Sequence, residues 1–443
     1  MIDSRPKRYL ISTWGCQMNQ HDTEKMAGIL AGLGYAPTLD DREADIILLN
    51  TCSVREKSES KVFGRLGRLR RLKMENPDLL IGVVGCVAQQ AGERIFRRAP
   101  FVDLVMGPRN LSRLAELIEL ARLEGRSIGL ARDDDPIVFP SGTTARAAGP
   151  KAFVTVMEGC NKSCTYCIVP FTRGREVYRA PVEVLAEVRD LAARGYCEIE
   201  FLGQNVNAYH HGEHDLAGLL YMADRVPGLR RVRFTTSHPG HLKKTIMDAM
   251  RDIPTVCNHL HLPVQSGCDR VLKAMNRGYT RAGYVAKIDY LKNAVPGMSF
   301  STDLIVGFPG ETDSEFQETL QLLRDLEFDQ VYAFAYSPRP GTEATRIEGA
   351  LPDNVKQERL RELLGLQESI QSRRNQSLVG RVFEVLVDGV GRLDNGLLKG
   401  RTRCNRIVHL PGPARRGEFV DVRITHGHPH SLIGEPLRER GAA

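Results

Sequence analysis

The sequence lacks any hydrophobic run long enough to cross a membrane. Its apolar runs, such as residues 46–49 and 79–84, are far shorter than the roughly 20 residues that a transmembrane helix needs. The first ten residues, MIDSRPKRYL, also lack the apolar core of a secretory signal. We therefore expect a cytoplasmic protein with no membrane partner, whose cysteines stay reduced and available as metal ligands.

The composition excludes neither an enzyme nor a binding protein. At 443 residues, with 42% hydrophobic and 26% charged side chains, the chain is typical of soluble globular proteins of two or three domains. Most of the net charge of +7 lies in residues 371–443. This basic tail, like a basic helix expected at residues 54–75, fits either a nucleic-acid partner or a merely solvated surface.

The most compact group among the 10 cysteines is Cys160, Cys164 and Cys167, in the stretch C-N-K-S-C-T-Y-C. Three cysteines on one short loop can bind three irons of a 4Fe-4S cluster and leave the fourth iron without a protein ligand. The alternative is structural zinc, which usually takes four Cys or His ligands. The nearest downstream candidates, Cys197 and His210, stand in no compact spacing to the three cysteines, so we predict an iron–sulfur cluster.

The N-terminal part of the chain alternates between strand and helix patterns. Helices are predicted near residues 20–34, 54–75 and 111–124, between and after strands at 7–13, 44–50, 79–84 and 102–106. Such alternation predicts an α/β domain with a doubly wound parallel sheet. Residues 126–150, which are rich in turn formers, are predicted to be a linker.

Cys16, Cys52 and Cys86 each follow one of the first three predicted strands. The carboxyl ends of neighbouring parallel strands line one crevice, which is where open α/β sheets bind ligands. A single cysteine there would more often be a buried small hydrophobe. Three in register predict a second iron–sulfur cluster that again has one open iron.

A second domain is predicted to contain six strands, mostly with helices between them, at residues 152–157, 198–202, 231–235, 260–263, 298–306 and 330–335. This order predicts a parallel β/α barrel, or an open arc of one, with its site at the carboxyl ends of the strands. The cysteine loop follows the first strand. Polar or turn-forming residues follow later strands and are candidate ligand contacts: Gln204, Gln265, Gly307 and Glu311.

The C-terminal segment changes character after a charged helix predicted at residues 353–376. Short strands are predicted at 381–387, 397–401, 407–410 and 418–425, separated by Gly, Pro and Asn. They suggest a small antiparallel β-barrel. Small β-barrels with basic faces often bind RNA, so fold and charge agree here.

Motifs along the whole chain resemble those of the radical S-adenosylmethionine (SAM) methylthiotransferases. The resemblance to the N-terminal domain of that family is carried by W-G-C-Q-M-N, N-T-C-S-V-R-E and V-G-C-V-A. Its catalytic core is resembled by E-G-C-N-K-S-C-T-Y-C, H-L-P-V-Q-S-G, M-N-R-G-Y-T, D-L-I-V-G-F-P-G-E-T and Y-S-P-R-P-G-T, and its RNA-binding TRAM domain by the tail. The first two motifs are similar to those of the MiaB-type branch, which acts on tRNA.

The resemblance implies four segments and a reaction. The segments are an N-terminal methylthiotransferase domain (1–125), a linker (126–150), a radical SAM core (151–376) and a TRAM-like domain (377–443). The reaction is methylthiolation of C2 of N6-isopentenyladenosine next to the tRNA anticodon, with two SAM molecules and two 4Fe-4S clusters. Because the adenine C2–H bond is neither acidic nor nucleophilic, acid–base groups have little to act on there and a radical is suitable.

By the same resemblance, Cys16, Cys52 and Cys86 would hold an auxiliary cluster that carries the sulfur. The cluster of the cysteine loop would cleave SAM, and the four candidate ligand contacts named above would touch SAM. This mechanism requires the N-terminal crevice to face the mouth of the barrel.

The implied partners are the anticodon stem–loop of tRNA and an electron-donor protein such as a flavodoxin, and we expect a monomer. Three alternatives stay open. The same chemistry would serve another modified adenosine or a ribosomal-protein side chain. A non-catalytic, metal-stabilised RNA-binding protein would need no SAM. A simple radical SAM enzyme would have one cluster and three structural cysteines.

Overall fold

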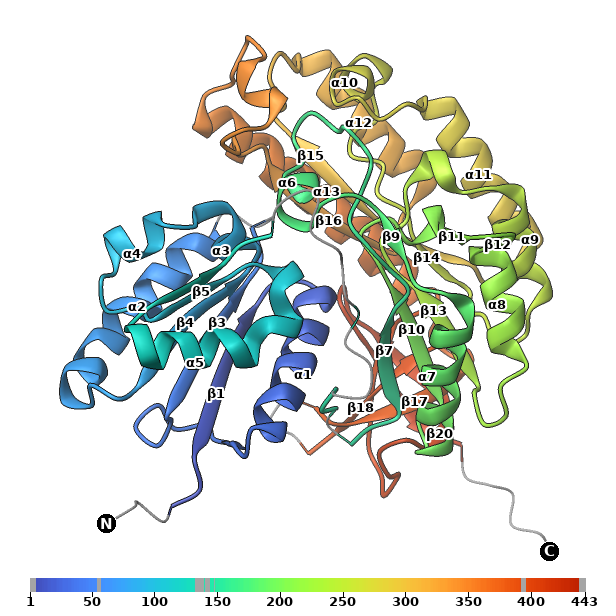
Figure 1. Cartoon of the computed structure of the whole chain (residues 1–443). Helices are drawn as coiled ribbons and strands as arrows, with labels where there is room; N and C mark the ends of the chain where they lie inside the picture. Colours follow the sequence, from blue (N-terminus) through green and yellow to red (C-terminus); the bar gives the residue numbers. More distant parts are fainter. Residues whose placement is uncertain are drawn as a thin grey trace, which may run out of the picture. The chain divides into compact units, whose positions relative to one another are not determined.

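The computed structural model describes residues 5–53, 57–131, 139, 144–146, 148–391 and 396–437. The chain forms two compact units (Figure 1). The first unit comprises Met1–Ala147, Glu158–Lys162 and Cys167–Val177, and the second comprises Ala148–Met157, Ser163–Tyr166 and Tyr178–Ala443. Within the described residues, no helix combines the length and apolar character that a membrane span requires.

The first unit is built on a six-stranded sheet in the order β2-β1-β3-β4-β5-β6. Every neighbouring pair is parallel. The strands are β1 (Arg8–Trp14), β2 (Ala36–Pro37), β3 (Ile46–Thr51), β4 (Leu80–Gly85), β5 (Leu104–Met106) and β6 (Ser127–Gly129). All residues of β3 and β4 are buried, as is typical of strands that helices cover on both faces.

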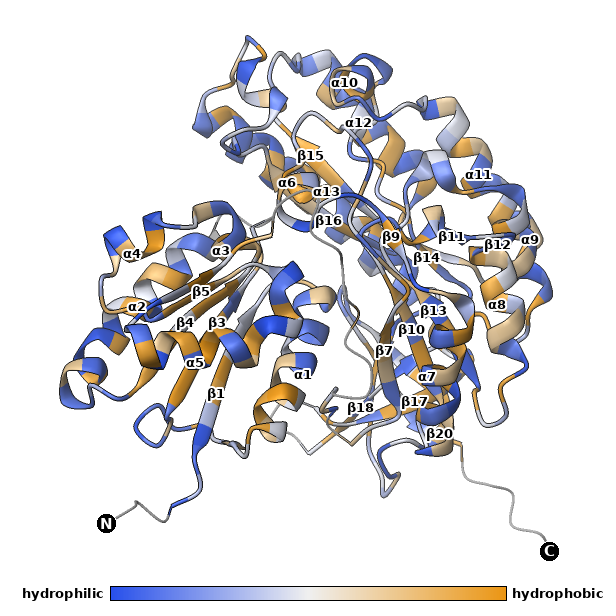
Figure 2. Ribbon diagram, in the orientation of Figure 1, coloured by the Kyte–Doolittle hydropathy of each residue, from blue (hydrophilic) through white to orange (hydrophobic). Residues whose placement is uncertain are grey.

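Helices pack on both faces of this sheet, which confirms the predicted doubly wound architecture. They are α1 (Gln17–Gly32), α2 (Lys57–Glu75), α3 (Cys86–Ala91), α4 (Arg94–Arg98), η1 (Pro108–Arg113) and α5 (Leu114–Glu124). One apolar core joins α2, α3 and α4 to the sheet, and a separate core joins α1 and α5 to it. Figure 2 shows the apolar strands enclosed between these helices.

The short strands β2 and β6 were not predicted. β6 pairs with β5 inside the stretch predicted to be a linker, so that prediction is wrong at its start. Strands of two or three residues are too short to show an alternating pattern in sequence. Much of the predicted linker, residues 132–138, 140–143 and 147, lies outside the described residues, as do residues 54–56 of the predicted basic helix.

The second unit begins with the predicted open arc of a parallel β/α barrel. One sheet has the order β13-β10-β7 and the other β14-β15-β16. A parallel bridge from Val232 to Val256 extends the first sheet toward the second. The strands are β7 (Lys151–Thr155), β10 (Glu198–Leu202), β13 (Arg231–Phe234), β14 (His259–His261), β15 (Ser299–Val306) and β16 (Gln330–Ala335).

Helices follow these strands, and all of them except α10, which packs in a separate small cluster, share one large apolar core with the arc. They are α7 (Pro181–Ala193), α8 (Leu216–Asp224), α9 (Lys244–Asp252), α10 (Asp269–Ala274), α11 (Arg281–Ala294) and α12 (Asp313–Leu326). The connections contain β8 (Met157–Glu158), α6 (Val169–Arg173), β9 (Val177–Tyr178), η2 (Val206–Ala208), β11 (His210–His211), β12 (His214–Asp215), η3 (Pro239–His241) and η4 (Glu343–Arg346).

A long helix, α13 (Asp353–Gln376), leads to a closed five-stranded barrel in the order β17-β18-β19-β21-β20. Its strands are β17 (Val382–Val390), β18 (Leu398–Thr402), β19 (Ile407–Leu410), β20 (Phe419–Gly427) and β21 (Leu432–Pro436). The prediction missed β21, whose pairing with β19 is parallel, so the barrel is mixed rather than purely antiparallel.

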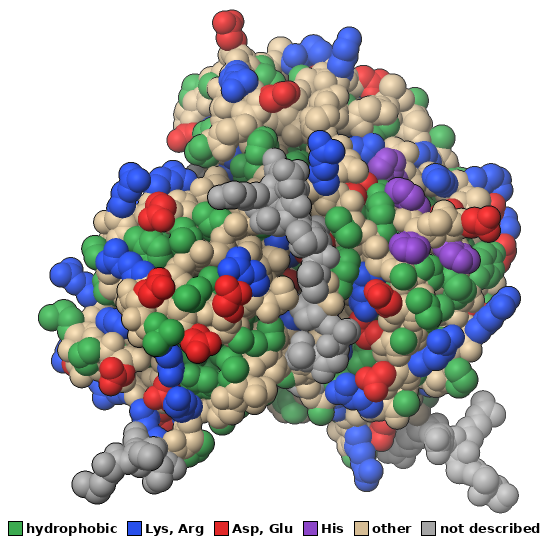
Figure 3. Space-filling model, viewed as in Figure 1, with side chains coloured by type: hydrophobic (Ala, Val, Ile, Leu, Met, Phe, Trp, Pro, Cys, Tyr) green, Lys and Arg blue, Asp and Glu red, His purple; other side chains and the backbone are tan. Residues whose placement is uncertain are grey.

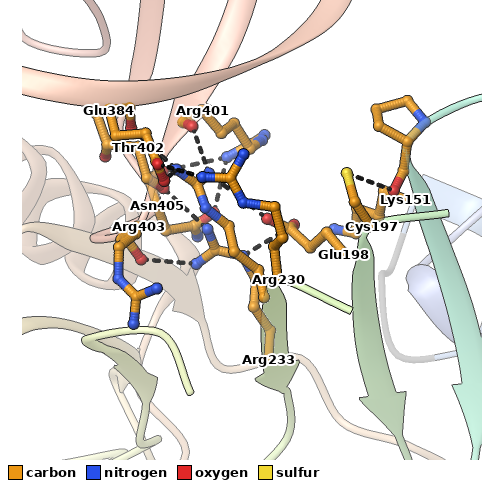
Figure 4. Close-up of polar contacts among 12 residues, drawn as sticks. Lys151, Cys197, Glu198, Arg230, Arg233, Glu384, Arg401, Thr402, Arg403 and Asn405 are labelled. Carbon is orange, nitrogen blue, oxygen red and sulfur yellow. Dashed lines mark hydrogen bonds and ion pairs between the residues drawn. The ribbon is translucent and has the colours of Figure 1, made fainter. Parts of the chain in front are cut away.

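The C-terminal barrel packs against the amino ends of the arc strands (Figure 4). Arg231, the first residue of β13, is fully buried and donates to the backbone carbonyls of Arg401 and Glu384, both at 2.9 Å. Arg233 donates to the carbonyls of Thr402 at 2.8 Å and Arg403 at 2.9 Å. The barrel therefore covers the amino-end edge of the arc. The predicted site lies at the opposite edge, at the carboxyl ends of the strands.

Candidate iron–sulfur and SAM site

Cys16, Cys52 and Cys86 follow three adjacent strands of the first unit, β1, β3 and β4. Cys16 is the N-cap of α1 and Cys86 is the first residue of α3, while the Cys52 backbone N–H donates to the Trp14 carbonyl at 3.0 Å. The thiols of Cys16 and Cys52 are hydrogen-bonded. The structure thus brings these side chains to one edge of the sheet, as the strand register predicted.

Glycines precede two of these cysteines for steric reasons. Gly15 has φ +154°, and a Cβ atom on it would lie 2.7 Å from the Cβ of Cys52. Gly85 has φ +91°, and a Cβ there would lie 2.7 Å from the Thr51 carbonyl oxygen. Only glycine combines these conformations with so close an approach. The motifs G-C-Q and G-C-V therefore reflect the packing of the strand ends.

Two buried asparagines, which the sequence analysis did not single out, fix the position of Cys16. Asn19 accepts from the Cys16 thiol at 3.3 Å and donates to Asn50 Oδ1 at 3.2 Å. Asn50 donates in turn to the Asn19 carbonyl at 2.8 Å. Both asparagines are fully buried. The only signal in sequence was their presence in C-Q-M-N and N-T-C.

The three thiols differ in acidity. A hydrogen bond from Cys52 lowers the pKa of Cys16 to about 6, with further lowering by Asn19 and by the charge of Arg173. Burial raises the pKa of Cys86, and the Arg173 guanidinium opposes that effect. Because the thiolate is the metal-binding form of cysteine, this edge of the sheet favours metal ligation first at Cys16.

Arg173 belongs to a buried ion network within the first unit. It donates to Asp22 Oδ2 at 2.6 Å and lies 3.8 Å from Glu158 Oε2. Lys25 lies 3.7 Å from the other oxygen of Glu158. All four residues are at most 4% exposed. This network anchors α6, which follows Cys167, to α1, which follows Cys16.

The loop that carries Cys160, Cys164 and Cys167 is held at both of its sides. In the first unit, the Cys160 N–H donates to the Gly174 carbonyl at 3.0 Å. In the second unit, Cys164 is buried, and Thr165 donates to the carbonyls of Met275 at 3.2 Å and Ala274 at 3.0 Å. Among the described residues, no three Cys, His, Asp or Glu side chains are arranged as ligands of a single metal ion.

The four predicted SAM contacts occupy the carboxyl-end rim of the arc, and their contact with SAM stays a prediction. Gln204 follows β10, and Gln265, at φ +73°, pairs with Leu304 beyond β14. Gly307, at φ +70°, follows β15 and donates its N–H to Glu311 at 2.6 Å. Arg359 also donates to that Glu311 oxygen at 2.7 Å, so this carboxylate shapes the turn.

Thr236 is a rim residue that the sequence analysis did not identify. It follows β13 with φ +72°, a conformation that is strained for a β-branched side chain. Such strain is concentrated at functional sites in proteins. Nothing in the sequence T-T-S-H indicated this conformation, because it depends on the path of the chain after the strand.

Comparison with known proteins matches three segments of the chain to family models. Residues 8–107 match the uncharacterized protein family UPF0004, residues 154–323 match the radical SAM superfamily, and residues 376–437 match the TRAM domain. Membership of the radical SAM superfamily implies a 4Fe-4S cluster and SAM as cofactors. The chain is also similar in fold to a radical SAM methyltransferase, TsrM, from Kitasatospora setae, with a TM-score of 0.57 and 15% identity over 77% of each chain.

The curated relatives are much more similar in sequence. The tRNA-2-methylthio-N(6)-dimethylallyladenosine synthase of Chromobacterium violaceum is 48% identical, over 98% of this chain and 100% of the relative. The enzyme of the same name from Burkholderia thailandensis is 46% identical, over 97% of each chain. Identity of this extent shows that the chain belongs to the tRNA-2-methylthio-N(6)-dimethylallyladenosine synthase family of radical SAM methylthiotransferases.

Proposed function

We propose that the chain transfers a methylthio group to C2 of N6-isopentenyladenosine next to the anticodon of tRNA. The observation that carries this proposal is the convergence of Cys16, Cys52 and Cys86 at adjacent strand ends. The same compact unit also contains Cys160 and Cys167 from the radical SAM loop. A simple radical SAM enzyme needs no second group of three thiols.

The donor atoms fit two 4Fe-4S clusters, because each group consists of three thiols. Cys16, Cys52 and Cys86 would hold the auxiliary cluster, and the loop cysteines would hold the cluster that binds SAM. When bound, the loop cluster would supply the electron that splits SAM into methionine and a 5′-deoxyadenosyl radical, and the auxiliary cluster would supply the sulfur that is transferred.

The chain's own contribution is to position the thiols and keep water away from them. Asn19 and Asn50 fix the Cys16 side chain, while Cys52 and Cys86 are buried. Arg173 places a positive charge beside Cys16 and Cys86. A cluster with thiolate ligands carries negative charge, so this guanidinium would favour cluster binding at the sheet edge.

The tRNA would be bound largely through its phosphates. Among the described residues of the region that matches the TRAM domain, four arginines are exposed: Arg381, Arg415, Arg416 and Arg423. On the face seen in Figure 3, Lys and Arg side chains are scattered among acidic and apolar ones. Affinity that rests on such contacts falls steeply with salt, and it must offset the few kcal/mol needed to unstack the target base.

The basic helix α2 offers less positive charge to RNA than its sequence suggests. Arg65 pairs with Asp41, and Lys73 donates to Asp103 at 2.9 Å. Arg68 and Arg70 are exposed, and we propose these two as phosphate contacts. We further propose that the enzyme acts as a monomer and takes electrons from a donor protein such as a flavodoxin.

Nucleoside analysis tests the proposal. The reconstituted chain is incubated without oxygen with SAM, a reductant and an anticodon stem–loop RNA that contains N6-isopentenyladenosine, and the digested RNA is analysed by mass spectrometry. We expect the 2-methylthio nucleoside together with 5′-deoxyadenosine. The Cys86→Ala variant should cleave SAM without forming the product. Formation of 5′-deoxyadenosine by the unmodified chain with no modified nucleoside would point instead to another substrate.

A further inference from the structure

Residues 275–277 of the motif M-N-R-G-Y-T hold the radical SAM cysteine loop, one contact after another. The Met275 carbonyl accepts from the Thr165 N–H at 3.2 Å. The Asn276 amide donates to the carbonyl and hydroxyl oxygens of Ser163, at 3.0 and 2.9 Å. Arg277 Nη1 donates to Cys164 Sγ at 3.3 Å. Only the last of these contacts brings a charge to a cysteine.

Arg277 is buried and its guanidinium is fixed on several sides. Nη2 donates to the Pro263 carbonyl at 3.1 Å, and Nε donates to the Tyr279 hydroxyl at 3.0 Å. Tyr279 donates in turn to the Val264 carbonyl at 2.7 Å. Nη1 also lies 3.4 Å from the Tyr166 hydroxyl. Nη1 therefore stays directed at the cysteine loop.

The backbone on either side of Arg277 adopts a conformation that turns this side chain toward the cysteine loop. Asn276 and Gly278 have φ of +55° and +69°, so the chain turns sharply after α10. Asn and Gly are the residues that adopt this left-handed conformation at the lowest cost. The turn directs Arg277 inward, where the residue is buried.

We propose that Arg277 is a positioning residue for the SAM-cleaving cluster, holding the Cys164 thiolate and raising the reduction potential of the cluster through a charge-assisted N–H···S bond. The inference rests on the proposed role of Cys164 as a cluster ligand. Hydrogen bonds to cluster sulfurs and nearby charge are two of the factors that set such potentials. A buried cation favours the reduced cluster, because reduction adds one negative charge.

The test is a redox titration of the full-length holoenzyme, monitored by electron paramagnetic resonance. The quantity measured is the reduction potential of the cluster whose spectrum changes when SAM is added. For Arg277→Gln we expect the one-electron reduction to become about tenfold less favourable, a shift of about 59 mV to more negative potential. Arg277→Lys, which retains the charge, should recover part of the shift. Iron content is measured alongside, because a purely structural role would change occupancy and leave the potential of the bound cluster unmoved.

Arg281→Gln is the matched control. This arginine lies four positions later and pairs with Asp325 at 2.9 Å rather than with the cysteine loop. Its replacement therefore removes the same charge at a distance from Cys164. We expect the unmodified potential from it. If Arg277→Gln lacks the SAM-responsive cluster, Tyr279→Phe replaces it, because loss of the hydroxyl loosens the guanidinium and should shift the potential in the same direction by less.

The outcomes separate this inference from the proposed function. A SAM-responsive cluster whose potential is the same in the unmodified enzyme, Arg277→Gln and Arg281→Gln would overturn the role of Arg277 alone. An unmoved potential in Tyr279→Phe would do the same if Arg277→Gln lacks the SAM-responsive cluster. A holoenzyme without any SAM-responsive cluster would overturn the ligand role of Cys164, and both proposals with it.

Discussion

At the scale of single residues, the three thiols at the sheet edge are not equivalent. Cys16 is kept acidic by the hydrogen bond from Cys52, whereas burial makes Cys86 less acidic than an ordinary thiol. In the cluster-free chain the thiolate therefore forms at Cys16 before it forms at Cys86. Iron that arrives during reconstitution would meet a ready ligand there, and its binding would help to deprotonate the buried neighbours.

The acidity of Cys16 can be measured by alkylation. In the cluster-free chain, its rate of reaction with iodoacetamide should rise with pH with a midpoint near 6, the pKa set mainly by the Cys52 thiol. Replacing Cys52 with alanine removes that donor and should move the midpoint to higher pH. Peptide mass spectrometry follows each cysteine separately. A midpoint for Cys16 equal to that of Cys197 in the same chain would contradict this account.

The meeting of Cys16, Cys52 and Cys86 at one sheet edge could be predicted because strand ends are visible in a sequence, while the ligand role of these cysteines and of the loop cysteines stays a prediction. The side chains that hold them could not, since their partners are remote. Arg173 meets Asp22 across 151 positions, and Arg277 meets Cys164 across 113. No local pattern encodes such contacts, although Arg277 lies within the motif M-N-R-G-Y-T.

At the scale of elements, the short helix α6 depends on one buried charge. Arg173 ties it to α1 through Asp22 and to Glu158, at 2.6 and 3.8 Å. Removing one partner of a buried ion network leaves the others unpaired in a medium that solvates charge poorly. Substitution of Arg173 should therefore lower the stability of the stretch after Cys167, whereas substitution of the exposed neighbours of Arg173 should not.

We expect Arg173→Met to destabilise the first unit by about 3–5 kcal/mol, the cost typical of breaking a buried ion pair. Arg175→Met, a similar change at an exposed position two residues away, should cost less than about 0.5 kcal/mol. Denaturant unfolding, followed by the fluorescence of Trp14 at the end of β1, measures both. Equal stabilities of the two variants would show that the network contributes nothing.

Elements with a clear local sequence pattern were predicted well whatever their length, and elements without one were not. The bounds of β10, β16, β19 and α13 agree with the predicted ranges, because each carries a clear apolar period or a clear change in composition. The strands β2, β6 and β21 were missed. The first two are very short, and the third stands in a stretch with Gly and Pro, which usually interrupt strands.

At the scale of the second unit, the arc and the C-terminal barrel are joined through buried arginines. Arg231 and Arg233 belong to β13 of the arc, and their guanidinium groups donate to backbone carbonyls of the barrel. Glu198 balances them, lying 2.9 Å from Arg233. Deletion of the barrel would remove the carbonyl partners of both arginines and leave Glu198 alone to balance their charge. A loss of tRNA affinity after such a deletion would therefore not by itself identify an RNA-binding surface.

Arg231→Met should loosen the C-terminal barrel from the arc. The variant loses the donors to Glu384 and Arg401, so limited proteolysis should cut near the end of α13 at least tenfold faster than in the unmodified chain. Arg230→Met is the control, because Arg230 forms a half-exposed ion pair with the same Glu384 and such pairs contribute about 0–1 kcal/mol. Equal cleavage rates in the two variants would contradict the role of the buried arginine.

For the whole molecule, the central claim is that one chain binds two iron–sulfur clusters through two separate groups of three cysteines. Iron, sulfide and zinc are measured after anaerobic reconstitution of the unmodified chain and of a variant with Cys160, Cys164 and Cys167 replaced by alanine. The account predicts about eight irons per chain falling to about four, with little zinc. A fall from about four irons to none would show that Cys16, Cys52 and Cys86 hold no cluster, and would contradict it.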